Sequence, residues 1–207
     1  MTPNSYLIPD KTAETEESIK KSRFITYITH TCGREKAQEF IRSMRQQHPD
    51  ARHHCWAFIA GSPNDAQQWG FSDDGEPSGT AGKPILARLC GSGIGEVCAI
   101  VVRYSGGIKL GTGGLVRAYG GGVGASLAVL ETTLRVPQSE LQLSCSYDQL
   151  NDIQHIVGQH KGAVVETVYG SSLELKLSIP TSQVSLFKDH LINFFKGNIV
   201  IASSKIH

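Results

Sequence analysis

An unbroken run of apolar residues, Val97–Val102, lies inside the segment that most constrains how this chain can fold. Glycine-dense, polar chain flanks it on both sides, with Ser72–Pro84 before it and Arg103–Tyr119 after it. An apolar run of this length that leads into glycine-rich chain indicates a strand buried on both faces. Glycine lets the backbone approach a ligand or another chain without an intervening Cβ, and so many glycines carry an entropic cost. The pattern therefore predicts one central strand with a specialised segment on each side of it.

Composition narrows the class of protein. The formal net charge is +1, so no general electrostatic attraction to nucleic acid or to a membrane is expected. No run reaches the roughly 18 apolar residues that a membrane-spanning helix needs, and the start of the chain lacks the pattern of a secretory signal. Five widely spaced cysteines without a Cys-x-x-Cys pair are typical of reduced thiols. We therefore expect a cytoplasmic protein without disulfides.

Periodicity outlines the first part of the chain. Residues 5–30 contain β-branched and alternating pieces that predict one or two strands. Apolar spacing of three and four predicts a helix over Gly33–Gln47, which Pro49 ends. Further elements are expected as a strand over Arg52–Ala60, a short helix over Lys83–Leu89 and a helix over Leu115–Leu130. The glycine triplet Gly120–Gly122 is unfavourable in a helix, which indicates close packing of that helix.

The composition changes near Val136–Ser139, and this predicts two domains, 1–136 and 137–207. The predicted elements of the second half follow the order β-α-β-β-α-β. They are Leu141–Tyr147, Asp148–His160, Ala163–Tyr169, Leu173–Ile179, Ser182–Lys196 and Ile199–Ser203. This order is that of the ferredoxin-like fold, so the expected class is α+β.

The acidic residues Asp73, Asp74 and Glu76 have two interpretations. Such a run can bind a divalent metal or act as general acid and base, but Asp-Gly also serves an ordinary solvated turn. His53 and Cys55 face one side of the predicted strand and His54 faces the other, so the three side chains do not form a three-ligand metal cluster. We expect no metal, no cofactor and no catalytic residue.

The turn before the helix over Leu115–Leu130 also has two interpretations. Lys109 and the glycines Gly111, Gly113 and Gly114 precede that helix, and a helix N-terminus with free N–H groups attracts anions. Arg117 would add positive charge. The alternative is a tight strand-to-helix turn that needs glycine conformations.

Four motifs together resemble the YigZ/Impact family, specifically its two-domain bacterial members. They are Lys21-Ser22-Arg23-Phe24, His53 within Ala51–Ala57, Ser72–Pro84 and Arg103–Tyr119. The resemblance implies a first domain like domain 2 of ribosomal protein S5 and a second domain like a ferredoxin-type domain of elongation factor G. Ser105 departs from the pattern, since an aromatic residue usually follows Tyr104 there.

The resemblance also implies a function. Eukaryotic members regulate translation in the stress response to amino-acid starvation, by competing for the ribosome-associated activator of the starvation kinase. No enzyme activity is firmly attached to the family. The leading hypothesis is therefore a non-enzymatic regulator that binds RNA or a ribosome-associated protein through a mixed-charge site on the glycine-dense face. The alternative is an enzyme or sensor that binds a phosphate-bearing ligand at Lys109–Gly114. The expected binding residues are Arg23, His53, Asp73, Asp74, Glu76, Lys83, Arg103, Tyr104, Gly106, Gly107, Lys109, Gly111, Gly113, Gly114 and Arg117.

Overall fold

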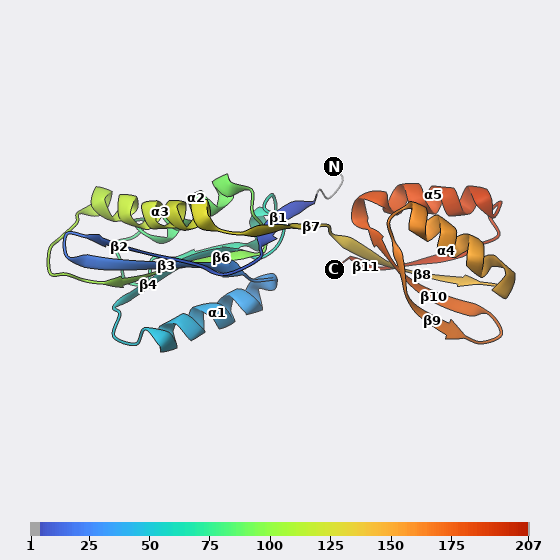
Figure 1. Cartoon of the computed structure of the whole chain (residues 1–207), viewed down its shortest axis with the longest axis horizontal. Coiled ribbons are helices and arrows are strands. Elements are labelled where there is room, and N and C mark those ends of the chain that lie inside the picture. The colour runs from blue at the N-terminus through green and yellow to red at the C-terminus, as the bar shows by residue number, and fades with distance from the viewer. Residues whose placement is uncertain (1–4, 207) are drawn as a thin grey trace. The chain divides into compact units, whose positions relative to one another are not determined.

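The computed structural model describes residues 5–206. Contacts between Cα atoms divide the chain into two compact units, the first spanning Tyr6–Arg135 and the second comprising the chain from Val136. Each unit has its own sheet and its own helices (Figure 1). The mixed α/β class with two domains is confirmed. The boundary between residues 136 and 137, and independent folding on either side of it, stay predictions.

The first unit is built on a five-stranded sheet in the order β2-β3-β6-β4-β5, in which every pair of neighbours is antiparallel. The strands are β2 (Ala13–Ile19), β3 (Ser22–His30), β4 (His53–Ile59), β5 (Trp69–Ser72) and β6 (Val97–Tyr104). The predicted buried run forms β6, which lies at the centre of the sheet and is covered on both faces. Its residues alternate between two apolar cores, one on each side of the sheet.

Three helices supply the cover (Figure 1). α2 (Gly82–Ser92) and α3 (Thr112–Val129) lie on one face of the sheet, and α1 (Gly33–Gln47) lies on the other. α1 forms where apolar spacing predicted it and buries Ala37 and Ile41. α3 begins three residues before the predicted start, because Gly111 at φ +76° turns the chain directly into the helix.

Close packing explains the glycines of α3. A Cβ on Gly122 would lie 2.6 Å from the Thr26 hydroxyl on β3, so only glycine allows this approach of helix to sheet. On the other side of the helix, a Cβ on Gly120 would lie 3.7 Å from the Arg88 side chain of α2. Glycine is thus required at position 122 for the approach of α3 to the sheet, whereas the distance at Gly120 is that of an ordinary van der Waals contact.

Three short strands were not predicted separately. Residues 5–30 form three strands, because β1 (Tyr6–Pro9) precedes β2 and β3. β1 pairs in antiparallel register with β7 (Thr132–Arg135), from the far end of the same unit. β5 is a four-residue edge strand inside the glycine-dense segment.

A buried carboxylate anchors this strand pair. The side chain of Glu96 accepts hydrogen bonds from the Tyr6 hydroxyl at 2.8 Å and from Arg135 Nε at 3.2 Å, and its other oxygen lies 2.7 Å from His30 Nε2. Burial acts to raise the pKa of Glu96, but the hydrogen bonds from His30 and Tyr6 outweigh burial, and the pKa is lowered. Glu96 therefore folds as a carboxylate that is held by its partners.

The second unit has a four-stranded antiparallel sheet in the order β11-β8-β10-β9. Its elements are β8 (Gln138–Cys145), α4 (Leu150–Gln159), β9 (Ala163–Tyr169), β10 (Leu173–Pro180), α5 (Val184–Phe194) and β11 (Val200–Ile206). In order of sequence the sheet runs 4-1-3-2 with two crossover helices, which is the ferredoxin-like topology that was predicted. Both helices lie on one face of the sheet (Figure 1), and Phe187 of α5 is a fully buried member of the apolar core.

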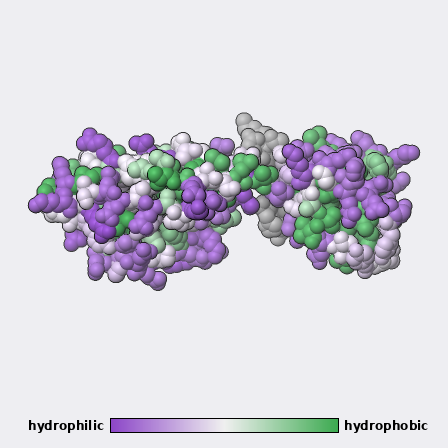
Figure 2. Space-filling model, in the orientation of Figure 1, coloured by the Kyte–Doolittle hydropathy of each residue, from purple (hydrophilic) through white to green (hydrophobic). Residues whose placement is uncertain are grey.

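The visible surface is mixed in character. Figure 2 shows hydrophilic residues over most of each unit, with hydrophobic residues scattered between them. Within the described residues, no helix is both long enough and apolar enough to cross a membrane.

Candidate functional site

The two glycine-dense segments meet at one end of the first sheet. Arg103, near the carboxyl end of β6, pairs in register with His53 at the start of β4 and with Phe24 on β3. Its Nη1 donates to Glu76 Oε1 at 2.6 Å. This contact joins the segment after β6 to the acidic loop after β5, and it defines the site that follows.

Asp73 organises the acidic loop. Its two carboxylate oxygens accept backbone N–H groups from Gly79 (2.8 Å), Ala81 (2.9 Å) and Gly82 (2.8 Å). Burial acts to raise the pKa of Asp73, but the three backbone hydrogen bonds together lower it. Gly82 is required at the start of α2, because a Cβ there would lie 2.8 Å from the backbone of Ser72. The carboxylate thus folds the loop onto the start of the helix.

Glu76 is buried beneath the loop, with 4% of its side chain exposed. The same oxygen that accepts from Arg103 also accepts from the Tyr119 hydroxyl of α3 at 2.7 Å. Arg103 is itself 8% exposed; its Nη2 lies 3.4 Å from the Ser22 hydroxyl, and its guanidinium carbon lies 5.4 Å from the centroid of the Phe24 ring. An acid from a loop, a base from a strand and a phenol from a helix therefore form one buried cluster.

The thiol and the phenol near this cluster stay protonated. Burial strongly raises the pKa of Tyr119, and burial likewise raises the pKa of Cys55, whose thiol donates to the Asp73 carbonyl at 3.0 Å. A nucleophile or a general base needs the opposite shift, toward neutral pH. Neither group has the lowered pKa of an activated nucleophile or general base. The absence of catalytic residues stays a prediction.

His53 and Asp74 complete this end of the sheet. A carbonyl oxygen only accepts, so His53 Nδ1 donates to the Asp74 carbonyl at 2.9 Å, and His53 Nε2 lies 4.0 Å from Glu76 Oε1. The Asp74 carboxylate accepts from Arg45 of α1 at 2.6 Å and from the backbone N–H of His54 at 2.7 Å. All three predicted carboxylates are thus engaged within the fold. Their direct contact with a partner stays a prediction.

Two predicted residues lie on the opposite face of the sheet. Tyr104 follows Arg103 in the strand and therefore faces α1, where its hydroxyl lies 3.0 Å from His48 Nδ1. Arg23 pairs with Tyr104 in register, places its guanidinium 5.6 Å from the Tyr104 ring centroid and forms a two-bond ion pair with Glu16. The structure does not bring these two residues into the buried cluster.

The glycine turn after β6 is exposed and rests on the β2–β3 hairpin. A Cβ on Gly106 would lie 2.0 Å from the Lys21 carbonyl oxygen, so glycine is required there, and the Gly106 N–H donates to the Ser22 hydroxyl at 3.2 Å. Gly107 and Gly111 have φ of +78° and +76°, a region that favours glycine. The turn conformation therefore accounts for these three glycines.

The free cations of the predicted site lie around this turn and along α2 and α3. The side chains of Lys83, Lys109 and Arg117 are exposed. At the start of α3, Gly113 is exposed and Gly114 is half-buried. α2 and α3 contain no Asp or Glu, whereas the sequence of α1 mixes both signs of charge. The structure thus buries Glu76 and engages the half-buried Asp73 and Asp74 in hydrogen bonds within the fold, whereas Lys83, Lys109 and Arg117 are exposed.

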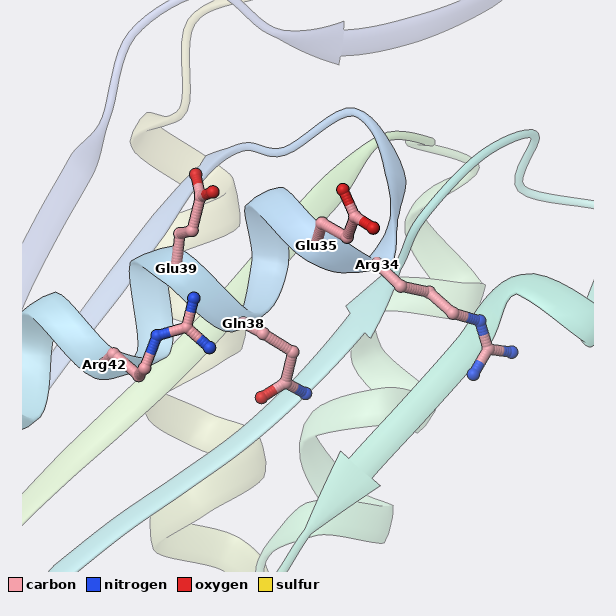
Figure 3. Close-up of a pocket in the computed structure, with 5 residues that line it drawn as sticks. All are labelled: Arg34, Glu35, Gln38, Glu39 and Arg42. Atoms are coloured by element: carbon pink, nitrogen blue, oxygen red, sulfur yellow. The ribbon is translucent and has the colours of Figure 1, made fainter.

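Other surface features do not join this site. The depression in Figure 3 lies on α1, and its lining is Arg34, Glu35, Gln38, Glu39 and Arg42. These side chains all come from one helix and share no residue with the predicted site. Across residues 5–206, no group of three or more His, Cys, Asp or Glu is placed to hold a metal ion.

Two members of the buried cluster were missed by sequence reasoning. Tyr119 lies on the apolar side of the predicted helix, where its spacing indicates only a core residue, and Ser22 is part of the Lys21–Phe24 motif. A phenol among aliphatic residues at a helix position is a signal for a buried hydrogen bond, because a buried tyrosine hydroxyl needs a partner. Nothing in the spacing indicates that the partner is Glu76.

Comparisons with known proteins match both halves of the chain. The family model described as Impact N-terminal domain matches residues 20–127, and one described as a domain of unknown function (DUF1949) matches residues 143–198. A crystal structure titled only as that of a hypothetical protein is 50% identical, with a TM-score of 0.73, over 97% of this chain and 98% of that one.

Named relatives agree with these matches. The IMPACT family member YigZ of Escherichia coli (strain K12) is 52% identical over 94% of this chain and 96% of its own length. An IMPACT family member of Haemophilus influenzae (strain ATCC 51907 / DSM 11121 / KW20 / Rd) is 47% identical over 95% of each chain. A family model that covers more than half of the chain, and relatives of this similarity over nearly its whole length, show that the chain belongs to the Impact family.

Proposed function

We propose that this protein is a cytosolic, non-enzymatic regulator that associates with the translation machinery through the glycine-dense face of its first unit. Family membership supports the translation theme, because the resemblance implies regulation of translation. The observation that supports the proposal is the distribution of charge: Glu76 is buried, Asp73 and Asp74 are engaged in hydrogen bonds within the fold, and α2 and α3 contain cations but no Asp or Glu. Exposed cations beside glycine backbone suit the phosphates of RNA.

The number of cations sets the expected salt dependence. Lys20, Lys83, Lys109 and Arg117 are exposed on this side of the unit. If each neutralises one phosphate, affinity should fall about 50-fold to 150-fold between 50 and 200 mM salt, from slopes of roughly 0.7 to 0.9 per contact. A binder with six or more such contacts would lose on the order of a thousandfold or more. We therefore expect specific binding with a moderate salt dependence.

The test is co-sedimentation of the purified chain with ribosomes from lysate, with and without nuclease. Replacing Lys83, Lys109 and Arg117 by Ala together should abolish association, and replacing any one of them should weaken it and lower the salt slope by about one. The matched control replaces Lys36 and Arg42, exposed cations of α1 on the other face of the sheet, and should leave association unchanged. Association that survives nuclease would assign the contact to a ribosome-associated protein. No association in either condition would refute the proposal.

A second candidate function rests on the start of α3. Gly111 precedes the helix without a side-chain cap, so the N–H groups of Thr112–Gly114 are left for an outside acceptor, with Lys109 and Arg117 nearby. This arrangement favours a sensor or enzyme that binds a phosphate-bearing small ligand. Binding to the folded state alone should raise the melting temperature in millimolar phosphate or nucleotide. An unchanged melting temperature would indicate that these glycines serve only the conformation of the turn.

A further inference from the structure

Strand β9 is an open edge of the second sheet (Figure 1). It pairs with β10 on one side, and on its other side it has no strand neighbour within residues 5–206. A bulge leaves Val165 without a partner on β10, so the regular part of the strand is Glu166–Tyr169. An unpaired edge strand is a template for a further strand, and proteins protect such edges with charge, proline or bulges. The regular part of β9 has one charged residue and no proline.

The backbone of this stretch offers hydrogen bonds at two defined residues. In the turn that joins β9 to β10, the Gly170 N–H donates to the Ser172 carbonyl at 3.1 Å. From that bond onward, antiparallel pairing directs the N–H and C=O groups of successive residues alternately toward the free edge and toward β10. The groups of Val168 therefore face β10, whereas those of Thr167 and Tyr169 face the free edge. The edge thus presents two donors and two acceptors that no strand of residues 5–206 pairs.

Exposed apolar side chains lie at the same edge. Val168 is 53% exposed and Tyr169 is 70% exposed, and the ring of Tyr147, itself 55% exposed, lies 6.5 Å from the Tyr169 ring between centroids. Val168 pairs in register with exposed Glu174 on the open face of the sheet, and Tyr169 pairs with buried Leu173 on the face that the helices cover. Large apolar side chains gathered beside unpaired backbone mark an interaction surface.

The sequence of this edge suits pairing with a second copy of itself. In an antiparallel pair about a two-fold axis, residues equally far from the axis lie opposite each other on the same face. An axis at Glu166 would set two carboxylates opposite each other, which is destabilising. An axis at Thr167 would set Tyr169 opposite the bulged Val165. An axis at Val168 sets Thr167 opposite Tyr169 twice, so every N–H and C=O that faces the edge gains a partner.

We propose that β9 pairs with β9 of a second copy of this chain, about a two-fold axis at Val168. The two Val168 side chains then pack on each other on the open face. On the other face, each Tyr169 packs beside a Thr167 methyl group, which is a favourable cross-strand pair. Glu166 lies opposite Gly170, so no like charges meet. Such an interface is small, and the dimer therefore forms in a concentration-dependent way. This inference concerns the second unit and does not rest on the proposed function.

Sedimentation equilibrium of the full-length chain tests the association. We expect the average mass to rise from that of one chain toward that of two between about 10 µM and about 500 µM, where small interfaces dissociate. Over the same range, amide hydrogen exchange should slow at Thr167 and Tyr169 and stay unchanged at Val168, whose N–H faces β10. A single-chain mass at every concentration overturns the proposal and leaves the edge to a strand of a different protein. Slowed exchange at Val168 alone overturns the pairing.

Charged variants test the position of the axis. Val168→Lys and Val168→Glu each set like charges opposite each other, so each variant alone should remain a monomer. A mixture of the two should associate at least about tenfold more tightly than either alone, because opposite charges then meet. The side chain of Val168 is exposed, so circular dichroism of both variants should match that of the unchanged protein.

The matched control is Gln142→Lys, which adds the same charge to an exposed residue of β8 on the open face, two strands from the edge. This control should associate as the unchanged protein does. Stronger self-association of Val168→Lys would set residue 168 opposite Glu166, with the axis at Thr167, and unchanged self-association would remove residue 168 from the interface. Either result overturns the proposed pairing.

Discussion

Replacing Glu76 by Gln should destabilise the first unit more than any other single change of a polar side chain in the candidate site. The substitution keeps the shape but removes the negative charge that Arg103 and Tyr119 share, at 2.6 and 2.7 Å. Only 4% of the Glu76 side chain and 10% of the Arg103 side chain are exposed, so water cannot replace the lost partner. Removing one partner of a buried pair costs about 3–5 kcal/mol. Tyr119→Phe removes one hydrogen bond to a charged acceptor and should cost about 1.5–3 kcal/mol.

A double-mutant cycle separates the pair from its surroundings. Arg103→Met alone leaves Glu76 buried without its base, whereas the double variant Glu76→Gln with Arg103→Met leaves no buried charge. We expect the double variant to cost at least about 1.5 kcal/mol less than the sum of the single variants, because buried pairs are strongly coupled.

The assay is urea unfolding at pH 7 followed by tryptophan fluorescence. The chain has two tryptophans, Trp56 and Trp69, and both lie in the first unit, so the signal reports that unit alone. Glu131→Gln, which breaks an exposed ion pair with Lys11, is the matched control and should leave the midpoint unchanged. Additive single-variant effects, or a Glu76→Gln variant as stable as the control, would refute the buried-pair reasoning.

Three further outcomes follow from local geometry. Gly82→Ala should destabilise the first unit by at least about 2 kcal/mol, since its Cβ would overlap backbone, whereas Gly121→Ala should stabilise it by up to about 1 kcal/mol; thermal unfolding of both variants measures the contrast. The lowered pKa of Glu96 stabilises the fold above the usual carboxyl pKa, and this contribution is lost as pH falls through the lowered value, so urea titrations from pH 7 to pH 3 should show the advantage over Glu96→Gln disappear. Thiol labelling of the native protein should modify exposed Cys32 first and reach Cys98 only after unfolding, as mass spectrometry of time points would show; early labelling of Cys98 would contradict the buried core.

Sequence patterns predicted the elements whose stability is local. α1 follows from its apolar spacing, β6 from its unbroken apolar run, and the second unit from clean alternation of strands and helices. β5 and β7 were missed because four-residue strands owe their existence to a partner and carry little signal of their own.

The candidate site was predicted in position but not in its internal organisation. The two glycine-dense segments meet because both adjoin the same end of the sheet. Which way Asp73 and Glu76 point depends on backbone N–H groups and on Tyr119, and no spacing rule encodes that choice.

The pairing of β1 with β7 also sets the order in which the first unit can mature during synthesis. Tyr6 pairs with Arg135, so the partner of the earliest strand emerges 129 residues later, from 135 minus 6. At roughly 5–20 residues per second, this wait is about 6–26 s. In the last part of that interval, after β6 is complete at Tyr104, the nascent chain has every strand of the five-stranded sheet, but β1 still lacks β7 and is the segment that a ribosome-bound chaperone would find open. The rate of synthesis, rather than the rate of folding, thus limits when the first unit is completed.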